Sequence, residues 1–338
     1  MTLAPVAANL PPIIMDGHCD VLLRLRDNGH TLTDPTEGDH HVDIPRWRAG
    51  GVNAVFFVAW INADRYPAEQ AVHRTWDLIA AFHEQLALHP DELAHCRTAR
   101  EVRAACGAGR IASLLAVEGG VALNEDLSLI AKYREAGVRY LTLTWQGNLS
   151  WVGSSHLNDG ESPMGLTEFG ADVVREMNRT GLVVDLSHVS DEAFYDVLRV
   201  SERPVLVTHS NSRTLSNHSR NLTDDMLRAL ADNDGMAGIN LYSGFLEPKG
   251  RGSSHPEAVP VTIDTVLDHI DHMVQVAGIN HVGLGTDWEG MKSPAQGLES
   301  ADRMPALISG LRGRGYSEGD INKIAAENLL RVLEANEG

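Results

Sequence analysis

The chain has 338 residues, 43% of them hydrophobic, and carries 46 acidic against 28 basic side chains, for a formal net charge of −18. This length suits one large α/β barrel or two domains. The acidic surface repels phosphate backbones and anionic lipids, so nucleic acids and membrane surfaces are poor candidate partners. Three widely spaced cysteines, Cys19, Cys96 and Cys106, match neither a disulfide framework nor a thiolate zinc motif.

Neither end of the chain shows a targeting or anchoring signal. The initial segment MTLAPVAANLPPII has no basic region, and prolines interrupt its apolar residues, so it does not resemble a signal peptide. No apolar stretch reaches the roughly 18 residues of a membrane span, and the segment NLLRVLEANEG reads as a charged amphipathic helix. We therefore expect a cytoplasmic protein.

Eight short apolar runs alternate with longer segments along the chain. The runs are almost continuously apolar, as strands buried on both faces of a parallel sheet are. They are IIMDGHCDV (13–21), VNAVFFVAW (52–60), IASLLAVEG (111–119), VRYLTLTW (138–145), LVVDLSH (182–188), PVLVTHS (204–210), GMAGINLY (235–242) and HVGLGTDW (281–288).

The intervening segments have the spacing of amphipathic helices. Apolar residues recur every three to four positions over 67–89 and 262–278, and a third helix is predicted between Thr167 as N-cap and Gly181 as terminator. Strands alternating with helices in this way predict an α/β fold, a (β/α)8 TIM barrel, with residues 1–338 forming one domain. A doubly wound open sheet is the alternative, but no glycine-rich phosphate loop follows the first run.

Polar residues stand where several of the runs end. His18 and Asp20 are two positions apart, so in a strand they project from the same face, with Cys19 turned into the core. Such a pair can hold a divalent metal, although taken alone it also fits a surface histidine and a capping aspartate. The corresponding residues of later runs are Glu118, His188, His209 and Asp287.

These residues together predict a metal site, because barrel enzymes place their chemistry at the carboxyl ends of the strands. Carboxylates buried together are costly unless a cation offsets them. The number of ligands exceeds the need of one tetrahedral zinc and fits two metals that share a carboxylate. Nitrogen and oxygen ligands suit Zn²⁺, with Mn²⁺ or Co²⁺ as substitutes, and a remaining carboxylate can act as general acid and base.

Two arginines follow the sixth run. Arg213 and Arg220 precede a helix for which Thr223 is the predicted N-cap. An arginine near a metal site can bind a substrate carboxylate through two parallel hydrogen bonds, or it can simply pair with an aspartate. The residue types alone do not separate Arg213 from Arg220.

The motifs DGHCD, VEGG, RYLTLTW, GLVVDLSH, PVLVTHSNSR, RNLTDDML and VGLGTDWEG follow one another from residue 16 to about residue 290. In these motifs the chain resembles the membrane (renal) dipeptidase family, the M19 metallopeptidases, over nearly its whole length. The resemblance implies an amidohydrolase-like barrel with two zinc ions. It implies that the metal ligands are His18 and Asp20 for the first zinc, Glu118 as the bridge, and His188 and His209 for the second zinc.

The resemblance also implies catalytic and substrate-binding roles. Asp287 would contact the water between the metals and carry its proton to the leaving amine. Arg220 would hold the C-terminal carboxylate of the substrate, which favours it over Arg213.

One position departs from the animal members of the family. Where they have a histidine that polarises the scissile carbonyl, this chain has Trp145, whose indole offers one N–H donor and no basic nitrogen. Either the metals polarise the carbonyl alone, or a residue of the following loop, Asn148 or His156, replaces the histidine. We expect His156 to be an ordinary exposed loop residue, and Trp145 and Asn148 to contact the substrate.

The sequence thus predicts a binuclear zinc dipeptidase that acts on L,L- and L,D-dipeptides through a hydroxide bridging the metals. One alternative keeps the site but changes the substrate to an N-acyl amino acid, a lactam or a specialised metabolite, which Trp145 would permit. The other is a non-catalytic metal-bearing barrel, against which Asp287 argues, because a scaffold needs no proton shuttle. A homodimer is compatible with such a barrel, although no residue pattern marks an interface.

Overall fold

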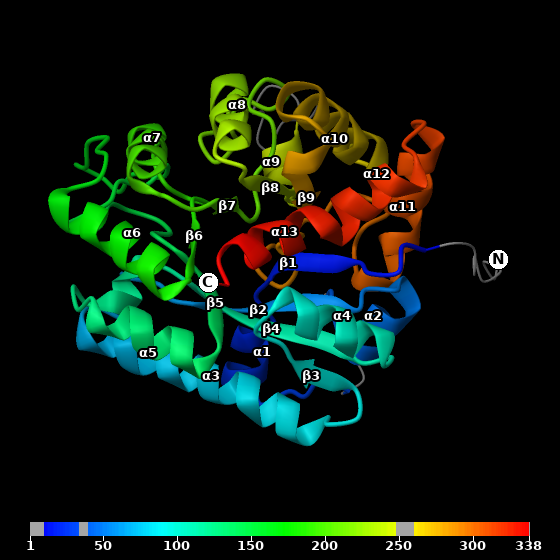
Figure 1. Cartoon of the computed structure of the whole chain (residues 1–338), viewed down its shortest axis with the longest axis horizontal. Helices are drawn as coiled ribbons and strands as arrows, with labels where there is room; N and C mark the ends of the chain where they lie inside the picture. The colour runs from blue at the N-terminus through cyan, green and yellow to red at the C-terminus, as the bar shows by residue number, and fades with distance from the viewer. Residues whose placement is uncertain (1–9, 34–39, 248–259, 338) are drawn as a thin grey trace.

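Eight parallel strands form the wall of a nearly closed barrel, and helices cover its outside (Figure 1). The computed structural model describes residues 10–33, 40–247 and 260–337. The predicted (β/α)8 architecture is confirmed. Along the wall, in hydrogen-bonded order, the strands are β1 (Met15–Cys19), β2 (Ala54–Trp60), β4 (Ile111–Glu118), β5 (Val138–Thr142), β6 (Val183–Asp185), β7 (Leu206–Val207), β8 (Met236–Ile239) and β9 (Val282–Leu284).

Each of the eight predicted runs contains one of these strands. The strands are shorter than the runs, because the last residues of most runs leave the ladder and turn toward the functional site. One strand was missed: β3 (Leu93–His95) pairs with the beginning of β4, off the path of the ring. Three residues are too few to show the period of a strand.

The predicted helix boundaries agree with the structure where capping residues marked them. The hydroxyl of Thr167 accepts the Gly170 amide, and Gly181 ends the same helix with a φ of 72°. Thr223 caps the helix that follows it, as expected. The helices are α1 (Val21–Asn28), α2 (Ile44–Gly50), α3 (Glu69–Leu88), α4 (Ala99–Gly107), α5 (Ser128–Ala136), α6 (Glu168–Thr180), α7 (Asp191–Val200), α8 (Asp224–Asp232), α9 (Ser243–Leu246), α10 (Ile263–Ala277), α11 (Met304–Gly313), α12 (Glu318–Asn322) and α13 (Asn328–Ala335).

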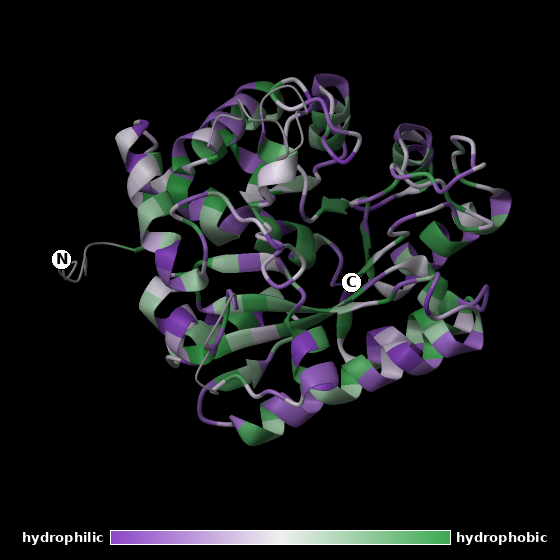
Figure 2. Ribbon diagram, turned by 180° about the vertical axis from the view of Figure 1, so that it is seen from behind, coloured by the Kyte–Doolittle hydropathy of each residue, from purple (hydrophilic) through white to green (hydrophobic). Residues whose placement is uncertain are grey.

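Alternate residues of the barrel strands face two different cores. On β2, Phe57 packs between strand and helices, with its ring centre 5.6 Å from that of Trp47 and 5.3 Å from that of Phe82. The preceding residue, Phe56, points into the barrel, where its ring lies 4.8 Å from that of Tyr140. Both faces are therefore apolar, which accounts for the unbroken apolar runs, and Figure 2 shows the hydrophobic strands inside mixed helices.

Helix α13 closes the amino-terminal end of the barrel. Its Leu330 and Leu333 belong to the same buried cluster as Met15 and Met236, which begin their strands. In Figure 1, α13 lies across the ring of strands near β1. Because this end is filled by leucine side chains, the opposite end, where the strands finish, is left for the functional site.

The seam between β1 and β9 has no regular ladder. It is closed by a few backbone hydrogen bonds, such as that from the Asp287 amide to the His18 carbonyl, and by a buried side chain. The Thr286 amide and hydroxyl both donate to the buried Asp16 carboxylate, at 2.9 and 2.7 Å. Nearby, a Cβ placed on Gly285 would lie 1.7 Å from the Thr208 carbonyl oxygen, so only glycine fits there. The strand ends meet closely, and this brings residues from the two ends of the chain into one site.

Other expectations concern the cysteines and the ends of the chain. All three cysteines are free, and Cys19 is buried in the core as predicted. Among the described helices, none is both long and apolar enough to cross a bilayer. Residues 1–9, part of the segment judged not to be a signal peptide, lie outside the described residues.

Candidate metal centre and substrate cavity

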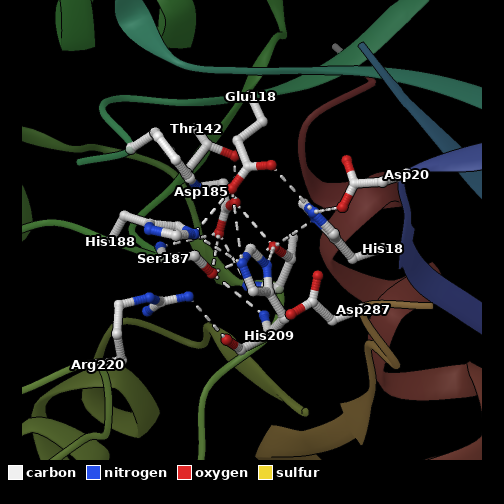
Figure 3. A network of polar contacts seen from close by, with 12 residues as sticks. His18, Asp20, Glu118, Thr142, Asp185, Ser187, His188, His209, Arg220 and Asp287 are labelled. Atoms are coloured by element: carbon white, nitrogen blue, oxygen red, sulfur yellow. Dashed lines mark hydrogen bonds and ion pairs between the residues drawn. The ribbon is translucent and has the colours of Figure 1, made fainter. Parts of the chain in front are cut away.

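Five buried side chains meet at the carboxyl ends of the strands, and a sixth, partly exposed, lies beside them (Figure 3). They fall into three overlapping groups whose possible ligand atoms lie within 4.8 Å of one another. The residues are His18 and Asp20 at the end of β1, Glu118 at the end of β4, His188 and His209 after β6 and β7, and Asp287 after β9. Every residue predicted as a metal ligand is thus in the cluster.

Glu118 occupies the middle of the cluster. Its Oε1 lies 2.8 Å from His188 Nε2 and 3.6 Å from His209 Nε2, while its Oε2 lies 3.3 Å from His18 Nε2. On the same side, Asp20 Oδ2 is 3.6 Å from His18 Nε2. The two oxygens of one carboxylate therefore face two different groups of side chains, His18 on one side and His188 and His209 on the other.

The donor atoms of this cluster fit a metal better than they fit one another. The Nε2 atoms of His188 and His209 are 3.0 Å apart. His18 Nε2, Asp20 Oδ1 and Glu118 Oε1 are buried without a hydrogen-bond partner among the described residues. Such groups are costly when left unpaired, and bound divalent cations would offset this cost.

Hydrogen bonds behind two histidines determine which nitrogen faces the cluster. The Tyr140 hydroxyl donates to the Gly17 carbonyl at 3.0 Å, so at 2.8 Å it accepts a proton from His18 Nδ1. The Thr208 hydroxyl donates to Asp185 Oδ2 at 2.8 Å and accepts from His209 Nδ1, also at 2.8 Å. In the neutral form of each ring, Nε2 is therefore the nitrogen without a proton, and it faces the cluster where a metal could bind it.

Asp185 is fully buried and accepts several of the hydrogen bonds that lie behind these histidines. Its carboxylate also accepts the Thr142 hydroxyl at 2.6 Å, the Ser187 hydroxyl at 3.1 Å and the Thr208 amide at 2.8 Å. Sequence analysis did not select Asp185, Tyr140 or Thr208. A signal was present for Asp185, since an aspartate interrupts the apolar run LVVDLSH three residues before His188.

Burial and neighbouring charges shift the pKa values of the three acidic residues in different directions. Burial and the neighbouring Asp20 raise the pKa of Asp287 to about 7, and burial raises the pKa of Asp20 to about 6. Burial also opposes ionisation of Glu118, but His18 and His188 outweigh it and hold the pKa of that carboxyl below its usual range. Three carboxyl groups so close together favour a bound cation.

Two residues of the site hold left-handed backbone conformations that are unusual for residues other than glycine. The φ angle is 73° at His188 and 65° at Asp287. Next to them, a Cβ on Gly290 would lie 2.2 Å from Asp20 Oδ2 and 2.4 Å from Asp287 Oδ1. Strained backbone of this kind persists where the surroundings impose it, and it turns both side chains toward the cluster.

The structure separates the two arginines that the sequence left equivalent. Arg213 makes two parallel hydrogen bonds to Asp191, at 2.6 and 2.7 Å, away from the cluster. Arg220 is buried, and its guanidinium contacts the His209 carbonyl and the Ser210 hydroxyl, both at 3.2 Å. No carboxylate of the described residues forms an ion pair with Arg220, whose Nε also lacks a partner.

A cavity of about 540 Å³ opens above the cluster. Its floor holds four of the cluster residues, and its walls combine aromatic, apolar and charged side chains. The residues lining it are Asp20, Leu23, Trp60, Glu118, Trp145, Gln146, His188, Tyr242, Phe245, Asp287, Glu289, Gly290, Met291, Lys292 and Ser293.

Trp145 and the two loop residues predicted as possible carbonyl-polarising groups, Asn148 and His156, lie in different places. Trp145 lines the cavity, with its ring centre 6.4 Å from that of His188. Asn148 is not among the lining residues; its amide donates to the Ser162 carbonyl and accepts the Ser154 amide, so it holds its own loop together. His156 is exposed, as expected.

Comparison with known proteins shows the family to which this fold belongs. A family model described as membrane dipeptidase (peptidase family M19) matches residues 7–338. A crystal structure described as dipeptidase AC, a metallopeptidase of family M19, is 31% identical, with a TM-score of 0.84 over 96% of this chain and 98% of that one. A metallopeptidase from Rhodobacter sphaeroides, bound to a phosphinate mimic of the dipeptide L-Ala-D-Ala, is 30% identical, with a TM-score of 0.85 over 97% and 100%. The probable dipeptidase PvdM from Pseudomonas aeruginosa shares the fold, with a TM-score of 0.88 at 20% identity over 96% and 95%.

Proposed function

The chain belongs to the M19 membrane dipeptidase family of metallopeptidases, and from this premise we propose that it hydrolyses dipeptides at two zinc ions. The observation that carries the proposal is the position of Glu118, whose two oxygens face His18 on one side and His188 on the other. His18 and Asp20 would hold one ion and His188 and His209 the other, with Glu118 shared. A set of ligands made only of imidazole nitrogens and carboxylate oxygens suits zinc, with Mn²⁺ or Co²⁺ as substitutes.

Two zinc ions in this position would supply an activated water and polarise the scissile carbonyl. The chain itself supplies the proton transfer. Asp287 reaches both the cluster and the cavity, and its Oδ2 accepts a hydrogen bond from Asn240 Nδ2 at 2.9 Å. This bond orients the carboxyl group and leaves Oδ1 to take the proton of the attacking water and pass it to the leaving amine.

Arg220 would hold the C-terminal carboxylate of the substrate. It is the buried arginine beside the cluster, and no acidic group of the described chain forms a direct ion pair with it. A carboxylate placed there would gain a charge-assisted hydrogen bond in a dry environment. With the α-amine held by the acidic residues of the cavity, such an enzyme binds both ends of its substrate and excludes longer peptides.

The relative that binds a phosphinate mimic of L-Ala-D-Ala supports extending the substrates to L,D-dipeptides. Trp145 favours one alternative. It lines the cavity at the position where the animal enzymes have a histidine, and this change is compatible with a substrate whose amine is blocked.

A hydrolysis screen separates these possibilities. Zinc-reconstituted enzyme is assayed on L,L- and L,D-dipeptides of equal composition and on their N-acetylated forms, with the metal content measured in parallel. We expect two zinc ions per chain, turnover of free dipeptides, and its loss in an Asp287→Asn variant that retains both metals. Turnover of the acetylated amides alone would mean that the substrates are N-acyl amino acids and not dipeptides. No turnover of any compound by protein that holds its metals would favour the hypothesis of a non-catalytic metal-bearing barrel.

A further inference from the structure

Aromatic side chains are scarce in this chain but gather at its cavity. The sequence has six tryptophans, six tyrosines and six phenylalanines. Four of them, Trp60, Trp145, Tyr242 and Phe245, line the cavity, and all four are partly exposed. Other aromatic residues of the described chain are also partly exposed or exposed but do not line the cavity: Tyr66, Trp76, Phe169, Tyr195 and Tyr316. Partly exposed aromatic rings facing a cavity are available to a ligand.

The four rings form two pairs. Trp60 and Trp145 meet edge to face, with ring centres 4.7 Å apart and planes at 79°. Trp60 is opposite Glu118 in the parallel ladder between β2 and β4, and Trp145 approaches His188. This tryptophan pair therefore borders the metal ligands Glu118 and His188.

The second pair lies beside Arg220. Tyr242 and Phe245 also meet edge to face, with ring centres 4.8 Å apart and planes at 90°. The guanidinium carbon of Arg220 lies 5.4 Å from the centre of the Phe245 ring. A carboxylate bound to Arg220 thus brings the C-terminal residue of the substrate to the Tyr242–Phe245 pair. The N-terminal residue is then left to the tryptophan pair.

We propose that the tryptophan pair selects dipeptides whose N-terminal residue carries an aromatic or long aliphatic side chain. This inference rests on the dipeptidase function proposed above and names its substrate class. Two indole faces meeting in a corner give a large apolar contact surface, and aromatic rings prefer the edge-to-face and offset contacts that such a corner offers. The cavity of about 540 Å³ has room for a dipeptide with one bulky side chain.

The test uses dipeptides that differ only in the N-terminal residue. Ala-Gly, Leu-Gly, Phe-Gly and Trp-Gly share the scissile bond, and their achiral C-terminal residue removes the question of L or D configuration. We expect kcat/KM for Phe-Gly to exceed that for Ala-Gly by roughly 10- to 100-fold, as burial of a large apolar side chain predicts. The ratio of the two values cancels any effect of a mutation on the chemistry common to both substrates.

Two variants and one control assign the preference to the pair. Trp145→Leu and Trp60→Leu each should lower the Phe-Gly to Ala-Gly ratio at least about threefold, because each removes one aromatic face. Trp76→Ala, which removes an exposed tryptophan of α3 outside the cavity, should leave the ratio unchanged. The melting temperature and the metal content identify any variant that is misfolded. The ratio of kcat/KM for Phe-Gly to that for Ala-Gly in the wild type tests the proposal without any variant.

The outcomes distinguish this proposal from the proposed function. Equal hydrolysis of Ala-Gly and Phe-Gly by the wild type overturns the substrate class but leaves a dipeptidase. A strong preference that persists in both folded tryptophan variants places the selective surface elsewhere and also overturns the inference. Failure to hydrolyse any of the four dipeptides, with metals bound, refutes the dipeptidase function itself.

Discussion

Removing the hydroxyl of Thr208 should weaken metal binding without touching a metal ligand. Thr208 Oγ1 accepts from His209 Nδ1 and donates to Asp185 Oδ2, both at 2.8 Å, and so connects a ligand to a buried carboxylate. In Thr208→Val, a methyl group replaces the hydroxyl, and the Nδ1 proton of His209 loses its acceptor. The imidazole then loses both its preferred tautomer and its fixed orientation.

The expected loss of metal affinity follows from the hydrogen bond between this hydroxyl and His209, a predicted metal ligand. Losing such a partner typically lowers metal affinity 10- to 100-fold, which corresponds to about 1.4–2.8 kcal/mol. Asp185 remains hydrogen-bonded to the Thr208 amide and to Ser187, so its carboxylate stays anchored. The loss should therefore concern the metal site more than the fold.

Thr142 offers a matched control. Its hydroxyl donates to the same oxygen of Asp185, at 2.6 Å, and among the described contacts it has none with a histidine of the site. Thr142→Val therefore removes a comparable hydrogen bond to Asp185 and leaves the link to His209 intact. Both variants should lose similar stability, on the order of 1–3 kcal/mol, but only Thr208→Val should lose metal affinity.

The assay is competition for zinc between the protein and a chromophoric chelator of known affinity, with urea unfolding of the metal-free proteins as the measure of stability. A Thr208→Val protein that binds zinc as tightly as Thr142→Val would refute the reasoning. Equal loss of affinity in both variants would show that Asp185, rather than its link to His209, sets the affinity.

Three further predictions concern the substrate, the metals and the barrel. Arg220→Ala should raise KM for dipeptides about 10- to 100-fold, whereas Arg213→Ala, whose guanidinium is bound to Asp191, should leave KM nearly unchanged; equal effects in steady-state kinetics would remove Arg220 from carboxylate binding. Removing the metals with a chelator should lower the melting temperature, because ligand at a hundred times its Kd stabilises the folded state by about 2.7 kcal/mol, and an unchanged melting curve would speak against a metal in the cluster. Gly285→Ala should destabilise the protein by at least roughly 1–3 kcal/mol in urea unfolding, since its Cβ would lie 1.7 Å from a carbonyl oxygen, while Gly107→Ala, with nothing within 4 Å, should stabilise α4 by about 0.5–1 kcal/mol.

The apolar runs were sufficient to predict the barrel because every wall strand is buried on both faces and lies within one run. The same logic predicted which side chains gather at the carboxyl ends of the strands, since residues such as Glu118 and His188 are unusual at the end of a buried apolar run. The short strand β3 was missed because three residues show no period.

Contacts between distant segments could not be predicted in the same way. Tyr140 reads in the sequence as an ordinary apolar strand residue, and only the folded barrel shows that its hydroxyl lies 2.8 Å from His18 Nδ1. The choice between Arg213 and Arg220 likewise depended on Asp191, which pairs with one of them across the loops. Burial of a residue type can be inferred from a pattern, whereas the partner of a polar group depends on the tertiary arrangement.

The left-handed backbone at His188 and Asp287 also bears on how this protein can be engineered. In that conformation a residue with a Cβ costs roughly 1–2 kcal/mol relative to glycine. A library of variants selected for heat resistance in the presence of a chelator should therefore accumulate glycine at positions 188 and 287, and these gains would come with loss of the metal site. Selection with zinc present should retain both residues, because the bound ions then stabilise the fold. Thermostabilisation of this enzyme is thus best directed at positions away from the cluster, and carried out with the metals in place.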